Sequence, residues 1–156
     1  MLSVFERKWQ SLPKFQRTRG VLRMLALWVA RAYQDGYAQN RPDALITLGA
    51  APLEDSLFRS EAFDQLGEGR LEAAVMADLA GDTANAVQLD AEAADTLKRA
   101  RLHRKAASAV FFDSSGGQSP TREYATLPEV RLAVGEPGLD IGNVETALEA
   151  LVDGCY

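Results

Sequence analysis

Apolar residues recur every three or four positions along most of this chain, which is the period of an amphipathic α-helix. The clearest case follows Thr18, which can cap a helix that stops at Asp35-Gly36. The apolar positions of one side are Val21, Leu22, Leu25, Trp28, Val29 and Ala32, and Met24, Leu27 and Ala30 fill much of the other. A helix that is apolar nearly all round is typical of a core or of a surface that a partner domain covers.

The same spacing predicts five further helices, and the acidic pair Glu54-Asp55 suits the positive start of the first of them. Their predicted spans are Glu54 to Gly67, Arg70 to Ala80, a long helix capped by Asp90 that reaches Phe111, Pro128 to Val134, and Ile141 to Val152. Asp82 to Ala86 has the composition of a turn, and Ala44 to Leu48 is a short extended candidate between breaking residues. We therefore predict a mainly α, multi-helix domain with at most a short strand near residues 44–48.

Two parts are expected along the chain. Residues 114–121 are rich in Ser, Gly and Pro and have the composition of a flexible linker. Residues 1–113 would form a helical domain. Residues 122–156, with two short helices across a tight turn, would form a helix-turn-helix or truncated winged-helix-like segment packed on that domain.

Composition limits the class of protein. With 156 residues the chain can bury roughly 70% of its unfolded surface. No apolar run approaches the roughly 18 residues that a bilayer span needs, and no secretory signal begins at Met1. A single cysteine, Cys155, cannot form an internal disulfide and is a poor candidate nucleophile. We expect a cytoplasmic protein without a membrane partner.

Charge is unevenly distributed along the chain. Residues 1–41 hold eight Lys and Arg against two acidic residues, a net charge of +6, whereas the remainder holds nine against twenty, a net charge of −11. A basic head on an acidic body suggests a surface for an anionic partner. The alternative, in which the head simply packs against the body, remains open.

Most catalytic chemistry is missing from the sequence. There is no Gly-x-x-x-x-Gly-Lys-Ser/Thr, and residues 116–119 lack both the spacing and the lysine that cradle a triphosphate. His103 is the only histidine, which excludes two-histidine metal sites, and its basic neighbours predict a position on a helix surface. Acidic pairs such as Glu92 and Asp95 are explained by helix capping. We expect no catalytic residue, no metal and no cofactor in this chain, which on its own would not be an enzyme.

Two features bear on nucleic-acid binding. The basic residues of the long predicted helix are a candidate contact for nucleic acid or phosphate: Lys98, Arg99, Arg101, Arg104 and Lys105. No aromatic residues are interleaved with them for base stacking, so a solvated helix face is the alternative. The last predicted helix carries four acidic residues from Asp140 to Asp153 and no basic one, which would repel DNA and favours protein contacts.

The segment Gly20-Val21-Leu22-Arg23 resembles the sensor-2 signature of AAA+ ATPases, a Gly-x-x-Arg at the start of a helix in the α-helical lid. The surrounding order of segments is similar to the C-terminal part of the ATPase module in large bacterial AAA+ predicted ATPases that contain a domain of unknown function. The segments that carry this likeness are Phe15 to Ala26, Pro52 to Asp55, Val87 to Ala93, Arg104 to Ala107 leading to Phe111-Phe112, and Leu127 to Leu151.

This resemblance implies roles for particular residues. Arg23 would be the sensor-2 arginine, with Arg19 as the alternative and Gly20 as the fixed glycine, and residues 127–151 would be the winged-helix-like part. ATP and Mg²⁺ would be held by a P-loop domain that precedes Met1 in a longer parent protein, which other subunits could join. The chain would then be a non-catalytic fragment that contributes the arginine and a nucleotide-dependent switch surface. Three alternatives stay open: a nucleic-acid-binding helical module, a protein-interaction helical module, and simple pairing of these arginines with the acidic body.

Overall fold

The computed structural model describes Glu6 and residues 18–38, 45–115 and 124–155, and every regular element in these residues is helical. The α-helices are α2 (Thr18–Ala38), α3 (Ser56–Leu66), α4 (Glu72–Val75), α5 (Asn85–Glu92), α6 (Asp95–Ala100), α7 (Leu102–Ser114), α8 (Leu127–Val134) and α9 (Asn143–Gly154). Two 3-10 helices, η1 (Leu48–Ala50) and η2 (Gly69–Leu71), and one π-helix, η3 (Met76–Ala80), complete this part of the chain. The prediction of a mainly α fold is confirmed.

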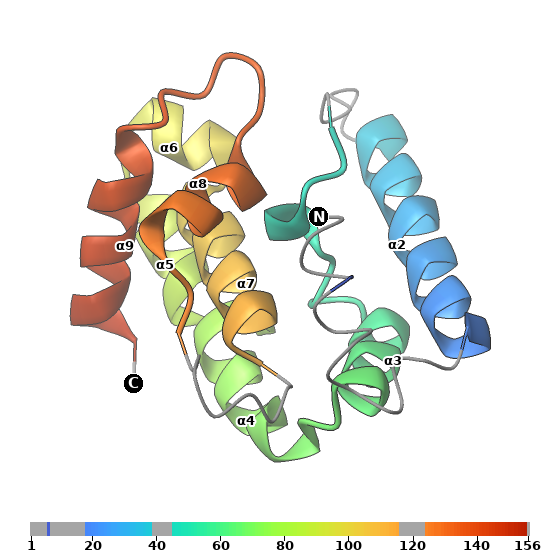
Figure 1. The fold of residues 1–156 in the computed structure, drawn as a ribbon. Coiled ribbons are helices and arrows are strands. Elements are labelled where there is room, and N and C mark those ends of the chain that lie inside the picture. The colour runs from blue at the N-terminus through green and yellow to red at the C-terminus, as the bar shows by residue number, and fades with distance from the viewer. Residues whose placement is uncertain (1–5, 7–17, 39–44, 116–123, 156) are drawn as a thin grey trace.

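Helix α7 lies at the centre of the molecule. It packs against η1, α5, α8 and α9, while α2 and α3 pack against each other on the far side of η1 (Figure 1). None of the described helices is long and apolar enough to span a membrane.

Aromatic side chains join these two groups of helices. Trp28 of α2 meets Phe58 edge to face with ring centroids 5.5 Å apart, and stacks on Phe112 of α7 at 6.1 Å. The Trp28 indole nitrogen also donates a hydrogen bond to the Ala50 carbonyl at 3.2 Å. Buried Val130 of α8 belongs to the same core. One continuous core therefore includes side chains from both predicted parts of the chain.

Local capping signals placed several helices correctly. The Asp55 carboxylate accepts from the amides of Leu57 and Phe58 at 3.0 and 2.9 Å, and Gly67 ends α3 in the left-handed conformation with φ 74°. Thr126 and Glu129 form a capping box at the start of α8. The predicted helices over 54–67, 128–134 and 141–152 are confirmed as α3, α8 and α9.

The extended candidate near residues 44–48 forms no strand where the structure describes it, from Leu45 onward, although Thr47 has an extended backbone. Leu48 begins η1 and is fully buried, and Gly49 lies directly on α7. A Cβ at Gly49 would come within 2.7 Å of the Lys105 carbonyl oxygen. The close approach of η1 to α7 explains why a compact turn forms here in place of a strand.

The long helix predicted from Asp90 to Phe111 is also wrong, because the chain breaks it into α5, α6 and α7. Ala93 and Ala94 are extended, and Arg101 has φ 51° and ψ 46°, in the left-handed region. Asp90 lies inside α5, which already begins at Asn85, within the segment predicted as a turn. These breaks allow α5 and α7 to pack side by side.

Helix α2 extends past its predicted end. Gly36 is a buried helical residue, and the helix continues to Ala38. The predicted linker lies largely outside the described residues, of which only Ser114 and Ser115 belong to it, at the end of α7. The connection of α8 and α9 covers residues 135–142, longer than the three or four residues of a helix-turn-helix turn.

Candidate functional site

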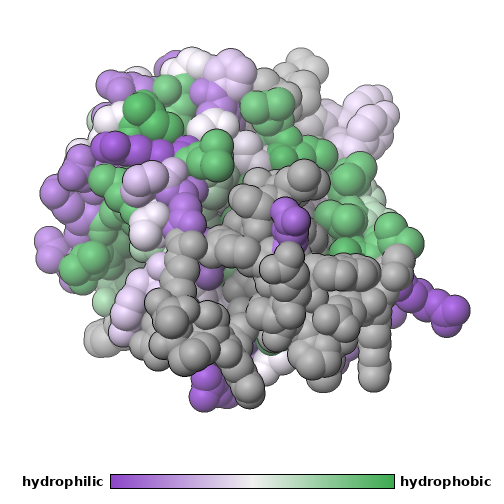
Figure 2. Space-filling view, in the orientation of Figure 1, coloured by the Kyte–Doolittle hydropathy of each residue, from purple (hydrophilic) through white to green (hydrophobic). Residues whose placement is uncertain are grey.

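The outward face of α2 is apolar although it lies in solvent. Its side chains form what we call the α2 stripe: Leu22, Ala26, Val29, Ala30, Tyr33 and Tyr37, all exposed. Tyr33 and Tyr37 are 74% and 82% exposed, and their rings stack with centroids 6.4 Å apart. Figure 2 shows hydrophobic side chains gathered over the part of the surface where α2 lies in Figure 1. A contiguous apolar face of this kind is typical of a surface that another molecule covers.

The inward face of α2 belongs to the core. Met24 and Trp28 are both 1% exposed and pack above α3 and η1. The sequence predicts that the helix lies in a core or against a partner domain, and among the residues that the structure describes only the inward face is covered.

Arg23 lies at the edge of the α2 stripe, near the start of the helix. Its side chain is 69% exposed, and its Nε lies 3.3 Å from Oε2 of Glu61 on α3. The other carboxylate oxygen of Glu61 accepts from the Gln65 amide at 3.1 Å. The exposed residues of α2 include Arg19 and Arg23 but no acidic residue, so this end of the stripe is positively charged.

Gly20 has a structural explanation in the packing of α2 on α3. A Cβ at this position would overlap the side-chain amide of Gln65, which is buried. Glycine therefore leaves room for the Gln65 side chain against α2, and the structure places Arg19, Gly20 and Arg23 on the first turns of this helix. The Oε1 atom of Gln65 is buried without a hydrogen-bond partner among the described residues.

The five basic residues from Lys98 to Lys105 do not share one solvated helix face, which was one of the two alternatives that the sequence left open. Lys98 donates to the Ala91 carbonyl at 2.9 Å, and Arg104 pairs with Glu54 at 3.2 Å. The side chain of Lys105 is only 5% exposed, and its Nζ lies 2.8 Å from Glu136. Arg99 is exposed on α6 and Arg101 is half-buried at the junction of α6 and α7. The helix break at Arg101 changes the chain direction between α6 and α7, and α7 then packs against η1. The basic side chains of α6 and α7 are therefore separated.

His103 is buried, so its predicted position on a helix surface is wrong. Its Nδ1 lies 2.8 Å from Oδ1 of Asp90, and that carboxylate also accepts from the backbone amides of His103 and Arg104 at 2.9 and 3.2 Å. Asp90 thus caps the start of α7 from another helix. Asp90 lies thirteen residues before His103, so the local sequence around α7 does not reveal this cap.

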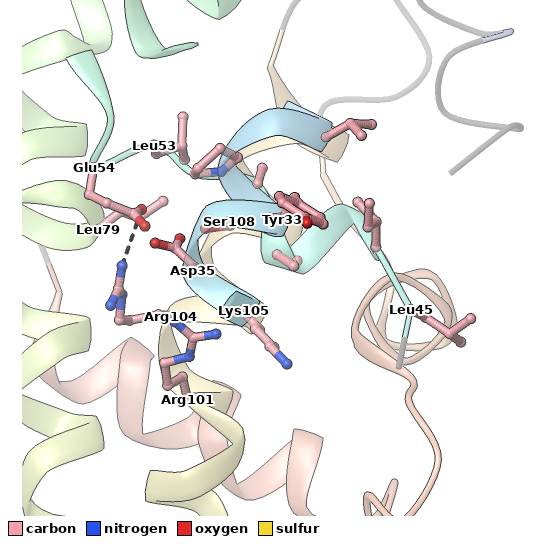
Figure 3. A pocket seen from close by; sticks show the side chains of 18 residues that line it. Tyr33, Asp35, Leu45, Leu53, Glu54, Leu79, Arg101, Arg104, Lys105 and Ser108 are labelled. Atoms are coloured by element: carbon pink, nitrogen blue, oxygen red, sulfur yellow. Dashed lines mark ion pairs between the residues drawn. The ribbon is translucent and has the colours of Figure 1, made fainter. Parts of the chain in front are cut away.

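A cavity of about 270 Å³ adjoins the α2 stripe, and we call it the α2–α7 cavity. It lies between the C-terminal half of α2, the segment 45–54 and the start of α7. Figure 3 shows the charged side chains of Asp35, Glu54, Arg101 and Arg104 gathered on one side of it, with Tyr33 and Leu45 on the other. No local pattern in the sequence indicates this cavity, because its walls come from segments that are distant along the chain.

Other reactive groups add little to this site. Among residues 18–38, 45–115 and 124–155, no three His, Cys, Asp or Glu side chains are placed to hold a metal ion. Burial, and then the nearby Asp78 carboxylate, raise the pKa of the Cys155 thiol above its ordinary value. The thiol is therefore protonated at neutral pH, which makes it a poor nucleophile.

Comparisons of the chain with protein-family models, with curated proteins and with solved structures found no match.

Proposed function

We propose that this chain is a non-catalytic helical module of a AAA+ type ATPase, in which Arg23 reaches the phosphates of a nucleotide bound by a neighbouring P-loop domain. The observation that carries the proposal is the position of Arg23, exposed at the N-terminal end of an uncovered apolar helix face. A P-loop domain seated on the α2 stripe would bury that apolar face. The same contact would bring the guanidinium beside bound nucleotide.

The charge around Arg23 supports this role. A cation beside a transferring phosphoryl group stabilises the negative charge that develops in the transition state. Arg19 adds a second positive charge on the same exposed face. Glu61, whose side chain is 13% exposed, pairs with Arg23, whose side chain is 69% exposed, so the guanidinium still has donors that face solvent and could bind a phosphate.

A second candidate is a protein-interaction module that uses the α2 stripe without nucleotide, and the exposure of Leu22, Val29 and the two tyrosines favours it. The nucleic-acid alternative has less support, because the pairing of Arg104 and Lys105 with carboxylates divides the basic cluster. Binding to a nucleic-acid backbone needs several basic side chains that face solvent on one surface.

The test uses the gene and the longest natural chain that contains this segment. We expect a P-loop in the residues encoded before Met1, and we expect the isolated chain to hydrolyse no ATP. In the longer protein, Arg23→Ala should lower kcat for ATP hydrolysis at least tenfold and change the Kd for ATP only a few-fold.

Arg99→Ala is the matched control, because Arg99 is exposed on α6 and lies outside the α2 face. Its kcat should equal that of the wild type. A gene without a P-loop, an isolated chain that hydrolyses ATP, or an Arg23→Ala variant with wild-type kcat would each overturn the proposal. Binding to a partner protein that tolerates Arg23→Ala but is lost in Tyr33→Ser would favour the second candidate.

A further inference from the structure

The α2–α7 cavity has apolar walls and a polar end. Its apolar lining includes Val29 and Ala32 of α2, Leu53 after η1, and Leu79 of η3. Val29, Tyr33, Leu45 and Ile46 are exposed residues at its rim. Concave sites with mostly apolar walls and a few polar groups are the usual form of a small-molecule site.

The polar end of the cavity carries more positive than negative residues. Three basic residues line it, Arg101, Arg104 and Lys105, against the two acidic residues Asp35 and Glu54. The Lys105 ammonium lies 2.8 Å from Glu136, which is not part of the lining, so Arg101 and Arg104 are the cations that face an anion here. Asp35 also forms an ion pair with Arg31 at 3.2 Å, on the same helix. The Arg104 guanidinium pairs with Glu54 through Nη2. Because an arginine side chain has five N–H donors, it can also donate to a second acceptor. The polar end is therefore suited to an anionic group.

The backbone at Arg101 points to a role for its side chain. Among the described residues, Arg101 is the one non-glycine residue with a positive φ, and it ends α6 and begins α7. Glycine is the residue that this conformation favours at a helix end. An arginine at this position costs free energy in the backbone but places a long cationic side chain at the cavity. Residues with such backbone strain are often found at binding sites.

From these observations we propose that the α2–α7 cavity binds a small amphipathic anion, with an apolar body against Val29, Leu53 and Leu79 and a carboxylate or phosphate group on Arg101 and Arg104. This site is separate from the nucleotide contact at Arg23 and goes beyond the proposed function. Of the five basic residues that the sequence grouped together, Arg101, Arg104 and Lys105 line the cavity.

The first experiment is a titration of the isotope-labelled protein with sodium decanoate below its micelle concentration, followed by amide chemical shifts. We expect one saturable site, with the largest shifts at Leu53, Leu79 and Ser108. Hexyl phosphate in a parallel titration shows whether phosphate or carboxylate is preferred, and inorganic phosphate alone should bind at least tenfold more weakly. Saturable binding of neither decanoate nor hexyl phosphate, or equal binding of decylamine, would overturn the proposal.

Variants at Arg101 separate binding from folding. Arg101→Gly suits the left-handed backbone, so the variant should fold, as its circular dichroism spectrum would show, whereas the Kd of the preferred anion should rise at least tenfold. Arg101→Lys should keep most of the affinity, and Arg99→Ala should keep all of it.

An Arg101→Gly variant with wild-type affinity, or shifts confined to the α2 stripe, would refute the site. Arg23→Ala should leave decanoate binding unchanged. The anion site and the nucleotide contact of Arg23 can therefore be refuted independently of each other.

Discussion

Helices α2 and α7 reverse the burial that their sequences suggest. The sequence of α2 is apolar nearly all round, yet Leu22 and Tyr33 lie in solvent. The sequence of α7 opens with Leu-His-Arg-Lys, yet His103 and Lys105 are buried. In these two helices, burial depends on whether polar side chains have partners and whether other helices surround the element. The apolar content of the helix sequence matters less.

The polar groups of α7 are satisfied by residues that are distant in sequence. Lys105 pairs with Glu136 beyond α8, and His103 pairs with Asp90 of α5. With these partners α7 can be surrounded by η1, α5, α8 and α9. The described residues of helix α2 include no buried charged side chain, and its outward face has no neighbour among the described residues.

The largest effect is expected at Lys105. Lys105→Ala removes the buried member of a partly buried ion pair and takes this cation from the Glu136 carboxylate, which should lower the free energy of unfolding by about 3–5 kcal/mol. Urea denaturation measures this loss. Lys98→Ala is the control, with an expected loss of about 0.5 kcal/mol or less, because Lys98 is exposed. A loss at Lys105 as small as that at Lys98 would show that α7 does not depend on its buried charge.

A paired substitution sharpens this point. Replacing both partners by apolar residues of similar size, Lys105→Met with Glu136→Leu, removes the buried charges together. The free energy of unfolding should then recover to within about 2 kcal/mol of the wild type.

The next effect is expected at Asp90. Asp90→Ala leaves two amides at the start of α7 and the His103 ring without their acceptor, which should cost about 2–4 kcal/mol. Thermal unfolding followed by circular dichroism measures the loss. Asp95→Ala, an exposed acidic residue in the first turn of α6, should cost under about 1 kcal/mol. Equal losses in the two variants would contradict the capping of α7 by Asp90.

The same contrast explains which parts of the fold the sequence could predict. Helix α3 has its capping residue Asp55 and its glycine stop Gly67 next to it in the chain, and its bounds were predicted closely. The division of the long helix depends on the left-handed Arg101 and on a cap that Asp90 supplies from another helix. Local periodicity carries no information on contacts of that range.

The candidate site was predictable to a similar degree. A Gly-x-x-Arg at the start of α2 is visible in the sequence, and its exposure near an apolar face agrees with the interpretation of α2 as a helix that a partner covers. The α2–α7 cavity was not predictable. It needs η1 to lie on α7 at Gly49 and Arg104 to pair with Glu54, two contacts between distant segments.

An intermediate effect is expected on the inward face of α2. Gly20→Ala introduces a methyl group where the Gln65 amide lies, and the helices must separate or Gln65 must move, at about 1–3 kcal/mol. Urea denaturation should show this loss, and the double variant Gly20→Ala with Gln65→Ala should recover part of it. A Gly20→Ala variant as stable as the wild type would contradict the close packing of α2 on α3.

The smallest effect is expected on the outward face of α2. Leu22→Ser and Tyr33→Ser should each change the free energy of unfolding by about 0.5 kcal/mol or less, because neither side chain loses a buried contact. The stack of Tyr33 on Tyr37 adds little, since both rings lie in water. Denaturant titration of the two variants measures this directly, with Trp28→Ala as a buried control at about 3–5 kcal/mol. A loss above about 1.5 kcal/mol at Leu22 or Tyr33 would show that the chain itself covers this face in solution. It would also remove the apolar surface on which both the nucleotide and the protein-interaction proposals depend.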